Sequence, residues 1–235
     1  MLKKFIFCFI SLIVFLGFSN SLVFAEETTN EKLIYLTFDD GLSPHMTDTF
    51  IEILNEEGVK ATFFVIGNTL EDNQLTLKKL VDSGHALGLH TYSHKGDLIY
   101  KSRSAFLDEM LKTQSIIKDL TGLTVNIIRF PFGSINHYFK LNQEWIDMLH
   151  DNNMKIYDWN VDTHDGDHYG NSPYNIFKAT VDTKDTIILL MHCTELNKNS
   201  ASALKETIKY YKEHGYTFKV IDDSTPEMYS FKNKK

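Results

Sequence analysis

The sequence predicts an α/β fold in one domain, with a parallel sheet that is open or closed into a barrel. Short apolar runs rich in β-branched and aromatic residues alternate with stretches that have the apolar spacing of amphipathic helices. Such alternation is typical of parallel strands joined by helices. No repeat, low-complexity segment or internal linker interrupts the pattern.

Seven strands are expected from the apolar runs. None of the runs contains an internal proline, and most are four to eight residues long, as strands usually are. The predicted strands are Leu33–Asp39, Ala61–Gly67, Ala86–His90, Asn126–Phe130, Lys155–Val161, Thr186–His192 and Tyr216–Ile221.

Four stretches between the strands predict helices. Three of them run up to a glycine, Gly58, Gly122 or Gly215, which is a common helix stop. The apolar positions at helical spacing are Met46, Phe50, Ile53 and Leu54; Phe106, Met110, Ile117 and Leu120; Trp145, Met148 and Leu149; and Ala201, Leu204, Ile208 and Tyr211.

Residues 1–25 are expected to be a signal peptide that is cleaved after Ala25. Lys3 and Lys4 form a basic start, Phe5–Phe18 is apolar but too short to span a membrane comfortably, and Val23-Phe24-Ala25 has small residues at a cleavage position. The mature protein is therefore expected to be secreted, without a stable membrane span. An uncleaved membrane anchor is the alternative. Residues 26–32 are a short polar lead-in, and residues 33–235 form the folded domain.

The charge of the mature chain excludes some partners. The full chain has a formal charge of −7, and loss of residues 1–25, which hold two lysines and no acidic residue, would make it −9. An acidic protein is a poor candidate for binding nucleic acid through bulk charge. Cys193 would be the single remaining cysteine, so no disulfide is expected within the domain.

Ionisable residues follow five of the predicted strands. Because the carboxyl ends of parallel strands meet at one edge, these residues are expected to converge there. Their convergence favours a functional site over a solvated turn at the Asp39-Asp40 pair. The five stretches are LTFDDG (36–41), HTYSH (90–94), RFPFG (129–133), VDTHDGDH (161–168) and TIILLMHC (186–193).

His90 and His94 predict a metal site together with a carboxylate. Two histidines and an aspartate such as Asp40 are ligands that Zn²⁺ accepts. Zinc proteases with this histidine spacing need a glutamate directly after the first histidine, and Thr91 excludes that class. Taken alone, the histidine spacing would also fit a structural pair on a helix face or a loop.

In this order, TFDDG, HTYSH, RFPFG, VDTHD and LMH resemble the five motifs of the polysaccharide deacetylases, carbohydrate esterase family 4. The resemblance runs from Leu33 to about Ile221. It implies a distorted (β/α)7 barrel as the single catalytic domain. It also implies metal-dependent removal of N-acetyl groups from amino-sugar polymers. One divalent metal ion per chain is expected, Zn²⁺ first, with Co²⁺ or another divalent ion as alternatives.

The resemblance also implies roles for residues around the metal. Asp40, His90 and His94 would be the metal ligands. Asp39 would be the general base, and Arg129 would orient and stabilise it.

Further roles follow from the third, fourth and fifth motifs. The backbone N–H of Phe132, after Pro131, would face the developing oxyanion. Asp165 would set the protonation of His192, the general acid, and Leu190 would line the pocket for the acetyl methyl group.

The fourth motif departs from the family pattern, in which Trp usually follows the aspartate. Here Gly166 follows Asp165, so the aromatic wall is missing. Trp159 or Tyr169 could replace it, or the groove is wider. The same stretch raises the question of a second metal at Asp162, His164, Asp167 and His168, for which a polar solvated loop is the preferred interpretation.

Other reactive or aromatic side chains are interpreted structurally. A buried core thiol is preferred over a nucleophile for Cys193. Phe63 and Phe64 are expected in the core, whereas stacking of Phe132 on sugar is left open. The histidines expected at the surface or in loops are His45, His85, His137, His150 and His214.

The expected partner is an acetylated glycan, with peptidoglycan N-acetylglucosamine as the first substrate. An exported single domain without a binding module is suited to its own cell wall. Chitin oligomers and O-acetylated xylan are the alternatives, and neutral chitin oligomers fit the acidic surface at least as well. The alternative from another class is a sugar-binding protein that has lost catalysis. The sequence does not determine the oligomeric state.

Overall fold

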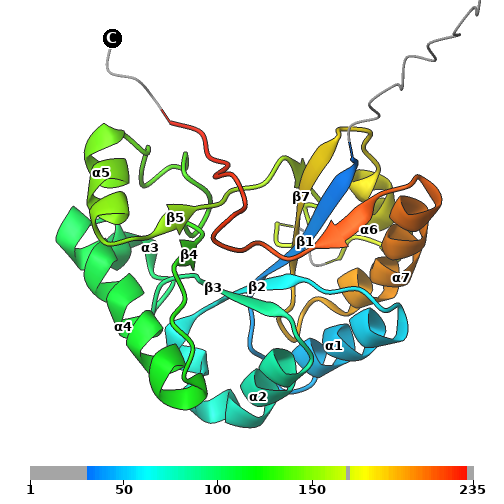
Figure 1. The fold of residues 1–235 in the computed structure, drawn as a ribbon, viewed down its shortest axis with the longest axis horizontal. Coiled ribbons are helices and arrows are strands. Elements are labelled where there is room, and N and C mark those ends of the chain that lie inside the picture. Colours follow the sequence, from blue (N-terminus) through cyan, green and yellow to red (C-terminus); the bar gives the residue numbers. More distant parts are fainter. Residues whose placement is uncertain (1–30, 168–169, 232–235) are drawn as a thin grey trace, which may run out of the picture. The chain divides into compact units, whose positions relative to one another are not determined.

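The computed structural model describes residues 31–167 and 170–231, which form one α/β domain around a parallel sheet (Figure 1). The predicted signal peptide and most of the polar lead-in lie outside the described residues, so both stay predictions. Among the described residues, no helix is long and apolar enough to cross a membrane.

Every pairing between the strands of the sheet is parallel, so the carboxyl ends lie at one edge. The order is β5-β4-β3-β2-β1-β7-β6, and β8 pairs with the first half of β1. The two ends of this order do not pair with each other. The predicted distorted (β/α)7 barrel is thus confirmed in an open, curled form. The strands are β1 (Leu33–Asp40), β2 (Thr62–Val65), β3 (Ala86–Leu89), β4 (Ile127–Ile128), β5 (Lys155–Ile156), β6 (Val161–Asp162), β7 (Thr186–His192) and β8 (Thr217–Lys219).

Strand β1 is the centre of the sheet. It is buried along nearly its whole length and pairs with β2, β7 and β8. A strand covered on both faces reads as a continuous apolar run, as residues 33–38 do. Asp39 and Asp40 therefore end the most buried strand of the domain.

The prediction of a single strand over residues 155–161 is wrong. Residues 155–156 pair with β4, whereas residues 161–162 pair with β7 at the other end of the sheet. The intervening carbonyls of Tyr157 and Asp158 accept hydrogen bonds from Arg129. These two carbonyls accept hydrogen bonds from a buried guanidinium rather than from a neighbouring strand. The chain then crosses from one end of the sheet to the other.

The helices cover the outside of the sheet, with α4, α2, α1 and α7 lying in succession along it (Figure 1). All four predicted helices are present, and Gly122 ends α4 in a left-handed conformation (φ 77°). Helices α2, α3 and α6 were not predicted; they are short, and few of their side chains are buried. The helices are α1 (Met46–Glu56), α2 (Gln74–Asp82), α3 (Gly96–Ile99), α4 (Arg103–Thr121), α5 (Gln143–Asp151), α6 (Pro173–Thr180) and α7 (Lys198–Glu213).

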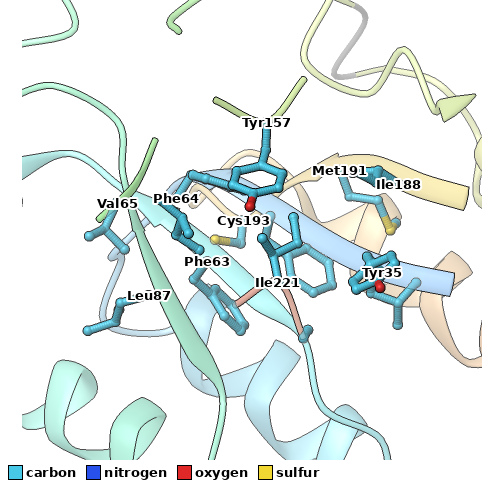
Figure 2. Close-up of a cluster of buried hydrophobic side chains, with 14 of the residues drawn as sticks. Tyr35, Phe63, Phe64, Val65, Leu87, Tyr157, Ile188, Met191, Cys193 and Ile221 are labelled. Carbon is cyan, nitrogen blue, oxygen red and sulfur yellow. The ribbon is translucent and has the colours of Figure 1, made fainter. Parts of the chain in front are cut away.

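Cys193 and the paired phenylalanines belong to the hydrophobic core. Figure 2 shows Phe63, Phe64 and Cys193 in one cluster of buried side chains, and all three are fully buried. Burial raises the pKa of the Cys193 thiol, which disfavours the thiolate that a nucleophile needs. The interpretation of these three residues as core residues is confirmed.

His85, assigned to the surface or a loop, lies in the loop before β3 but is buried rather than at the surface. His85 is 6% exposed and packs edge-on against Phe63, and its Nδ1 accepts a hydrogen bond from the backbone N–H of Ala61. Its Nε2 has no partner. Burial, with the nearby charge of Lys60, lowers its pKa to about 4. The imidazole is therefore neutral at physiological pH.

This buried histidine predicts a pH dependence of stability. Because the folded-state pKa lies below the ordinary value of 6.5, the unfolded chain takes up a proton first as the pH falls. The free energy of unfolding should be highest above about pH 6.5. It should decrease by up to about 3 kcal/mol as the pH falls from 6.5 to 4. His85→Asn keeps an acceptor for Ala61 and should flatten this part of the profile in urea unfolding at fixed pH. The control His214→Asn, at an exposed position, should leave the slope unchanged; an unchanged slope in His85→Asn would contradict the assignment.

Candidate functional site

The two adjacent carboxylates at the end of β1 both face one pocket. Neighbours on a strand normally point to opposite faces, but Asp40 has a left-handed backbone (φ 73°), which breaks the alternation. Nε2 of His90 lies 3.6 Å from Oδ1 of Asp40 and 3.8 Å from Oδ2 of Asp39. Both carboxylates therefore face the same pocket, although their neighbours differ.

The candidate metal ligands converge. Single ligand atoms of Asp40, His90 and His94 lie within 4.8 Å of one another, and no other group of the described residues meets this criterion. Oδ1 of Asp40 is buried without a hydrogen-bond partner and lies 3.3 Å from Nε2 of His94. An orphaned carboxylate oxygen facing two imidazoles fits a divalent cation of the Zn²⁺ type.

The histidines are fixed by contacts outside the ligand set. Nδ1 of His90 lies 2.9 Å from the carbonyl oxygen of Arg129, which requires a proton on Nδ1 and leaves the lone pair of Nε2 facing Asp40. His94 sits in a loop after β3, so the histidine pair is not on a helix face. The Glu109 carboxylate accepts hydrogen bonds from the N–H groups of Tyr92 and Ser93 and so pins this loop.

Glu109 is a positioning residue that the sequence analysis did not find. It lies on α4, far from the motifs in sequence. A glutamate on a partly exposed helix gives no signal of such a role.

Asp39 is held by a buried arginine. Nη1 of Arg129 donates to Oδ1 of Asp39 at 2.8 Å and to the hydroxyl of Thr37 at 2.7 Å. The guanidinium is fully buried, and its remaining donors reach the carbonyls of Tyr157 and Asp158. This charged partner keeps the Asp39 carboxylate in one orientation, with Oδ2 towards His90.

The neighbouring strand β7 brings an Asp–His pair to the pocket, because His192 is the register partner of Asp39. Nδ1 of His192 lies 2.8 Å from Oδ1 of Asp165, whose Oδ2 accepts hydrogen bonds from the His192 backbone N–H and the hydroxyl of Ser200. Burial alone would lower the pKa of His192, but the hydrogen bond and charge of Asp165, with Asp39 and Asp40, raise it to about 9. The imidazole is thus protonated at neutral pH, and its Nε2 has no hydrogen-bond partner among the described residues.

Phe132, Pro131 and Leu190 also lie at the pocket. Phe132 has a left-handed backbone (φ 66°), and no described residue accepts a hydrogen bond from its backbone N–H. The carbonyl of Pro131 accepts a hydrogen bond from Tyr100, which holds the turn. The side chain of Leu190 lines the pocket although it is almost fully buried.

The pocket measures about 480 Å³ and is lined by both apolar and charged side chains. Phe132 and Ile135 are among the apolar ones and are both nearly half exposed. Asp162, His164 and Asp167 are among the polar ones. The full lining is Asp39, Asp40, His90, His94, Phe132, Ile135, Asn136, His137, Trp159, Asp162, His164, Gly166, Asp167, Leu190 and His192.

Trp159 is a candidate for the missing aromatic wall. It lines the pocket, and its indole N–H donates to Oδ2 of Asp162. Tyr169, the other candidate, lies outside the described residues.

A second metal site does not assemble among the described residues of the 161–168 loop. Nδ1 of His164 lies 3.8 Å from a carboxylate oxygen of both Asp162 and Asp167, and the three do not converge on a common point. His168 lies outside the described residues. The loop is polar and partly exposed, as the preferred interpretation held.

Left-handed backbone conformations gather at this site. Of six described non-glycine residues with positive φ, five belong to the pocket or its histidine loop, and one, Thr91, is β-branched. Such conformations cost about 1–3 kcal/mol each and persist where the surroundings enforce them. The five are Asp40, Thr91, His94, Phe132 and His164.

The chain matches a known protein family over most of its length. The family described as polysaccharide deacetylase matches residues 26–167. The peptidoglycan-N-acetylglucosamine deacetylase PgdA of Listeria monocytogenes is 33% identical over 192 residues, which are 82% of this chain and 38% of that protein. The peptidoglycan-N-acetylmuramic acid deacetylase PdaA of Bacillus subtilis is 30% identical, with 83% of this chain and 72% of that protein covered.

Solved structures agree with this assignment. The polysaccharide deacetylase Bc1974 of Bacillus cereus superposes with a TM-score of 0.78 at 28% identity, covering 86% of this chain and 97% of that one. A BA3943 mutant, described as a pseudoenzyme of carbohydrate esterase family 4, gives 0.71 at 28% identity, covering 82% and 66%. The chain therefore belongs to the polysaccharide deacetylase family.

Proposed function

We propose that this protein is a metal-dependent hydrolase that removes N-acetyl groups from a glycan of amino sugars. One observation carries the proposal: a metal-ligand set, a carboxylate held by a buried arginine, and a protonated histidine held by an aspartate face one pocket. Amide hydrolysis needs a base for the attacking water, a charge sink and a proton for the departing amine, and the pocket supplies a candidate for each.

The metal site belongs to this proposal. Asp40, His90 and His94 would hold the ion, and their donor atoms favour Zn²⁺, with Co²⁺ as an alternative. When bound, such an ion supplies Lewis-acid activation of water and of the amide carbonyl.

Asp39 is proposed as the general base. It accepts a proton from the attacking water as the new C–O bond forms at the acetyl carbon. Arg129 keeps the carboxylate oriented towards this position through the bond to Oδ1. The backbone N–H of Phe132, which lacks an internal acceptor, is available to the oxygen on which negative charge develops.

His192 is proposed as the general acid. Its imidazolium donates a proton to the amide nitrogen as the C–N bond breaks, so that the sugar leaves as an amine and acetate remains. Asp165 favours the protonated form and fixes the ring through Nδ1. Leu190 is placed to contact the acetyl methyl group.

The charge of the pocket favours a neutral sugar. Outside the groups assigned to the metal and the base, the acidic residues Asp162 and Asp167 line it, and no lysine or arginine of the described residues does. N-acetylmuramic acid carries a lactyl carboxylate, whereas N-acetylglucosamine does not, so the second is the proposed substrate unit. Peptidoglycan is the first polymer that we propose as the substrate, because the N-terminal sequence favours export. Chitin oligomers and O-acetylated xylan remain the alternatives.

The chain spans 38% of the Listeria relative, so activity and substrate are proposed for this chain on its own residues. The rival is an inactive sugar-binding protein, and the family includes a pseudoenzyme of the same fold. Against the rival, each group that the chemistry needs is present at the pocket.

Acetate release decides between these functions. Purified protein with Zn²⁺ should release acetate from N-acetylglucosamine units in peptidoglycan and chitin oligomers, and more slowly from N-acetylmuramic acid and acetylxylan. Asp167→Asn, at an exposed rim position, should raise the muramic-to-glucosamine rate ratio by about two- to five-fold because one repelling charge is removed. Asp108→Asn, exposed on α4 outside the pocket, is the matched control.

Two results of this panel would count against the proposal. No acetate from any substrate would favour the sugar-binding rival. A wild-type preference for muramic acid would reject the charge argument.

Changing Asp39 or Asp40 to asparagine should have different effects on metal binding and turnover. Asp40→Asn should lose bound metal by elemental analysis, because it removes a charged ligand. Asp39→Asn should keep the metal and lose turnover by on the order of 10²–10⁴-fold, because the base is gone while Asn can still accept from Arg129. Unfolding curves control for damage to the fold. Equal metal loss in both variants would contradict this division of roles.

The pH profile should report the Asp165–His192 pair. Because His192 acts protonated, activity should fall as the pH rises through its pKa, which Asp165 holds high. Asp165→Asn removes the attracting charge, so the alkaline limb of kcat/KM should move to lower pH. A bound cation would lower the pKa of His192, whereas Asp165 raises it. The prediction is therefore the direction in which the alkaline limb moves from wild type to Asp165→Asn.

Ser200→Ala is the matched control for this profile. It removes a hydrogen bond to Asp165 but keeps the carboxylate, so it should move the alkaline limb less than Asp165→Asn does. An alkaline limb that stays in place in Asp165→Asn would remove Asp165 from this role.

A further inference from the structure

The apolar surface beside the pocket continues beyond the residues that line it. Phe132 and Tyr138 are 45% and 41% exposed, and their ring centroids lie 5.6 Å apart. Phe132 lines the pocket, whereas Tyr138 does not. We call these two rings, with the exposed side chain of Ile135 at the pocket, the aromatic rim. The aromatic rim thus leads from the pocket onto the neighbouring surface.

The loop that carries Tyr138 is held in one conformation by hydrogen bonds of its own. The side-chain oxygen of Asn136 accepts from the backbone N–H groups of Tyr138 and Phe139. The side-chain nitrogen of Asn136 donates to the carbonyls of Pro131 and Gly133. Phe139 is buried and anchors the loop to the core. A surface that is already formed loses less conformational entropy when a ligand binds.

The ring of Tyr138 is itself fixed by its neighbours. A Cβ atom at position 96 would stand 2.5 Å, 2.6 Å and 2.8 Å from three carbon atoms of this ring, so the ring lies directly against the backbone of Gly96. It also stacks on Tyr100, with the ring centroids 6.2 Å apart. The ring therefore keeps its place while a large part of the residue stays exposed.

Other exposed aromatic rings have no such connection to the pocket. Within the described part of the chain, the remaining exposed tyrosine and phenylalanine are Tyr174 and Phe231, and neither makes a ring contact with a residue that lines the pocket. Single exposed apolar side chains are ordinary, whereas a continuous apolar surface beside a ligand pocket is typical of a binding site. The aromatic rim is therefore the better candidate for contact with a ligand.

We propose that the aromatic rim binds a sugar unit next to the one whose acetyl group is removed, with Tyr138 as the main contact. The inference rests on the proposed function, in which the substrate is a glycan. A pocket of about 480 Å³ has the size of a small-molecule site, so the further units of a polymer lie outside it. The C–H face of a pyranose ring packs on an aromatic ring, and the tyrosine hydroxyl can remain in water.

The test compares how a tetramer of N-acetylglucosamine and the monosaccharide bind. Asp39→Asn is the parent protein, so that the acetyl groups stay on the ligand during calorimetry. Adding Tyr138→Ala should weaken binding of the tetramer by about five- to twenty-fold, because the ring beneath the neighbouring unit is lost. Binding of the monosaccharide should change by less than about two-fold, since Tyr138 does not line the pocket.

Three further variants separate the ring from its packing. Tyr138→Phe keeps the ring and should bind the tetramer nearly as the parent does. Tyr138→Leu keeps an apolar side chain against Gly96 but has no ring, so it should weaken tetramer binding and keeps the test decisive if Tyr138→Ala folds poorly. Tyr174→Ala, at an exposed position on α6, is the matched control and should bind both ligands as the parent does.

Two outcomes would overturn the proposal on its own. One is unchanged tetramer binding in both Tyr138→Ala and Tyr138→Leu, and the other is an equal loss of affinity for tetramer and monosaccharide. The proposed function fails by a different result: wild-type protein that binds the tetramer through Tyr138 but releases no acetate is not a deacetylase, although the rim still binds sugar. No binding of the tetramer to the parent would reject both.

Discussion

The buried guanidinium of Arg129 is the interaction on which the rest of the structure depends. It lies at the end of β4 and binds Asp39 and Thr37 on β1 and the carbonyls of Tyr157 and Asp158. A buried charge is tolerated only when its donors are matched, so one side chain fixes three segments at once. The chain leaves β5 at these residues and continues to β6, which pairs with β7 at the other end of the sheet.

Backbone conformation is the second constraint on the site. The left-handed turn at Asp40 brings two consecutive carboxylates to one pocket, where Arg129 holds the first and the second faces the histidines. Similar conformations at Thr91, His94 and Phe132 aim a loop and a backbone N–H at the same space. Strain of this kind needs compensation, which the buried strand β1 and the bonds of Glu109 provide.

The proposed acid and the proposed base of the pocket differ in the charged partner that each one has. Asp39 keeps an arginine partner, whereas His192 keeps an aspartate partner that raises its pKa to about 9. His192 is held in the protonated form that its proposed role requires, and both groups are oriented by a bond to a buried partner.

The sequence by itself determined the parallel α/β class, six of the strand positions, four of the helices and the five reactive stretches, because apolar periodicity and residue type are local signals. Only the tertiary structure decided the split of residues 155–161, the burial of His85 and the role of Glu109. These features depend on partners far along the chain, which local patterns do not encode. The left-handed turn at Asp40 belongs with them, since strand alternation alone placed the two aspartates on opposite faces, whereas contacts from β3 and β4 hold them in one pocket.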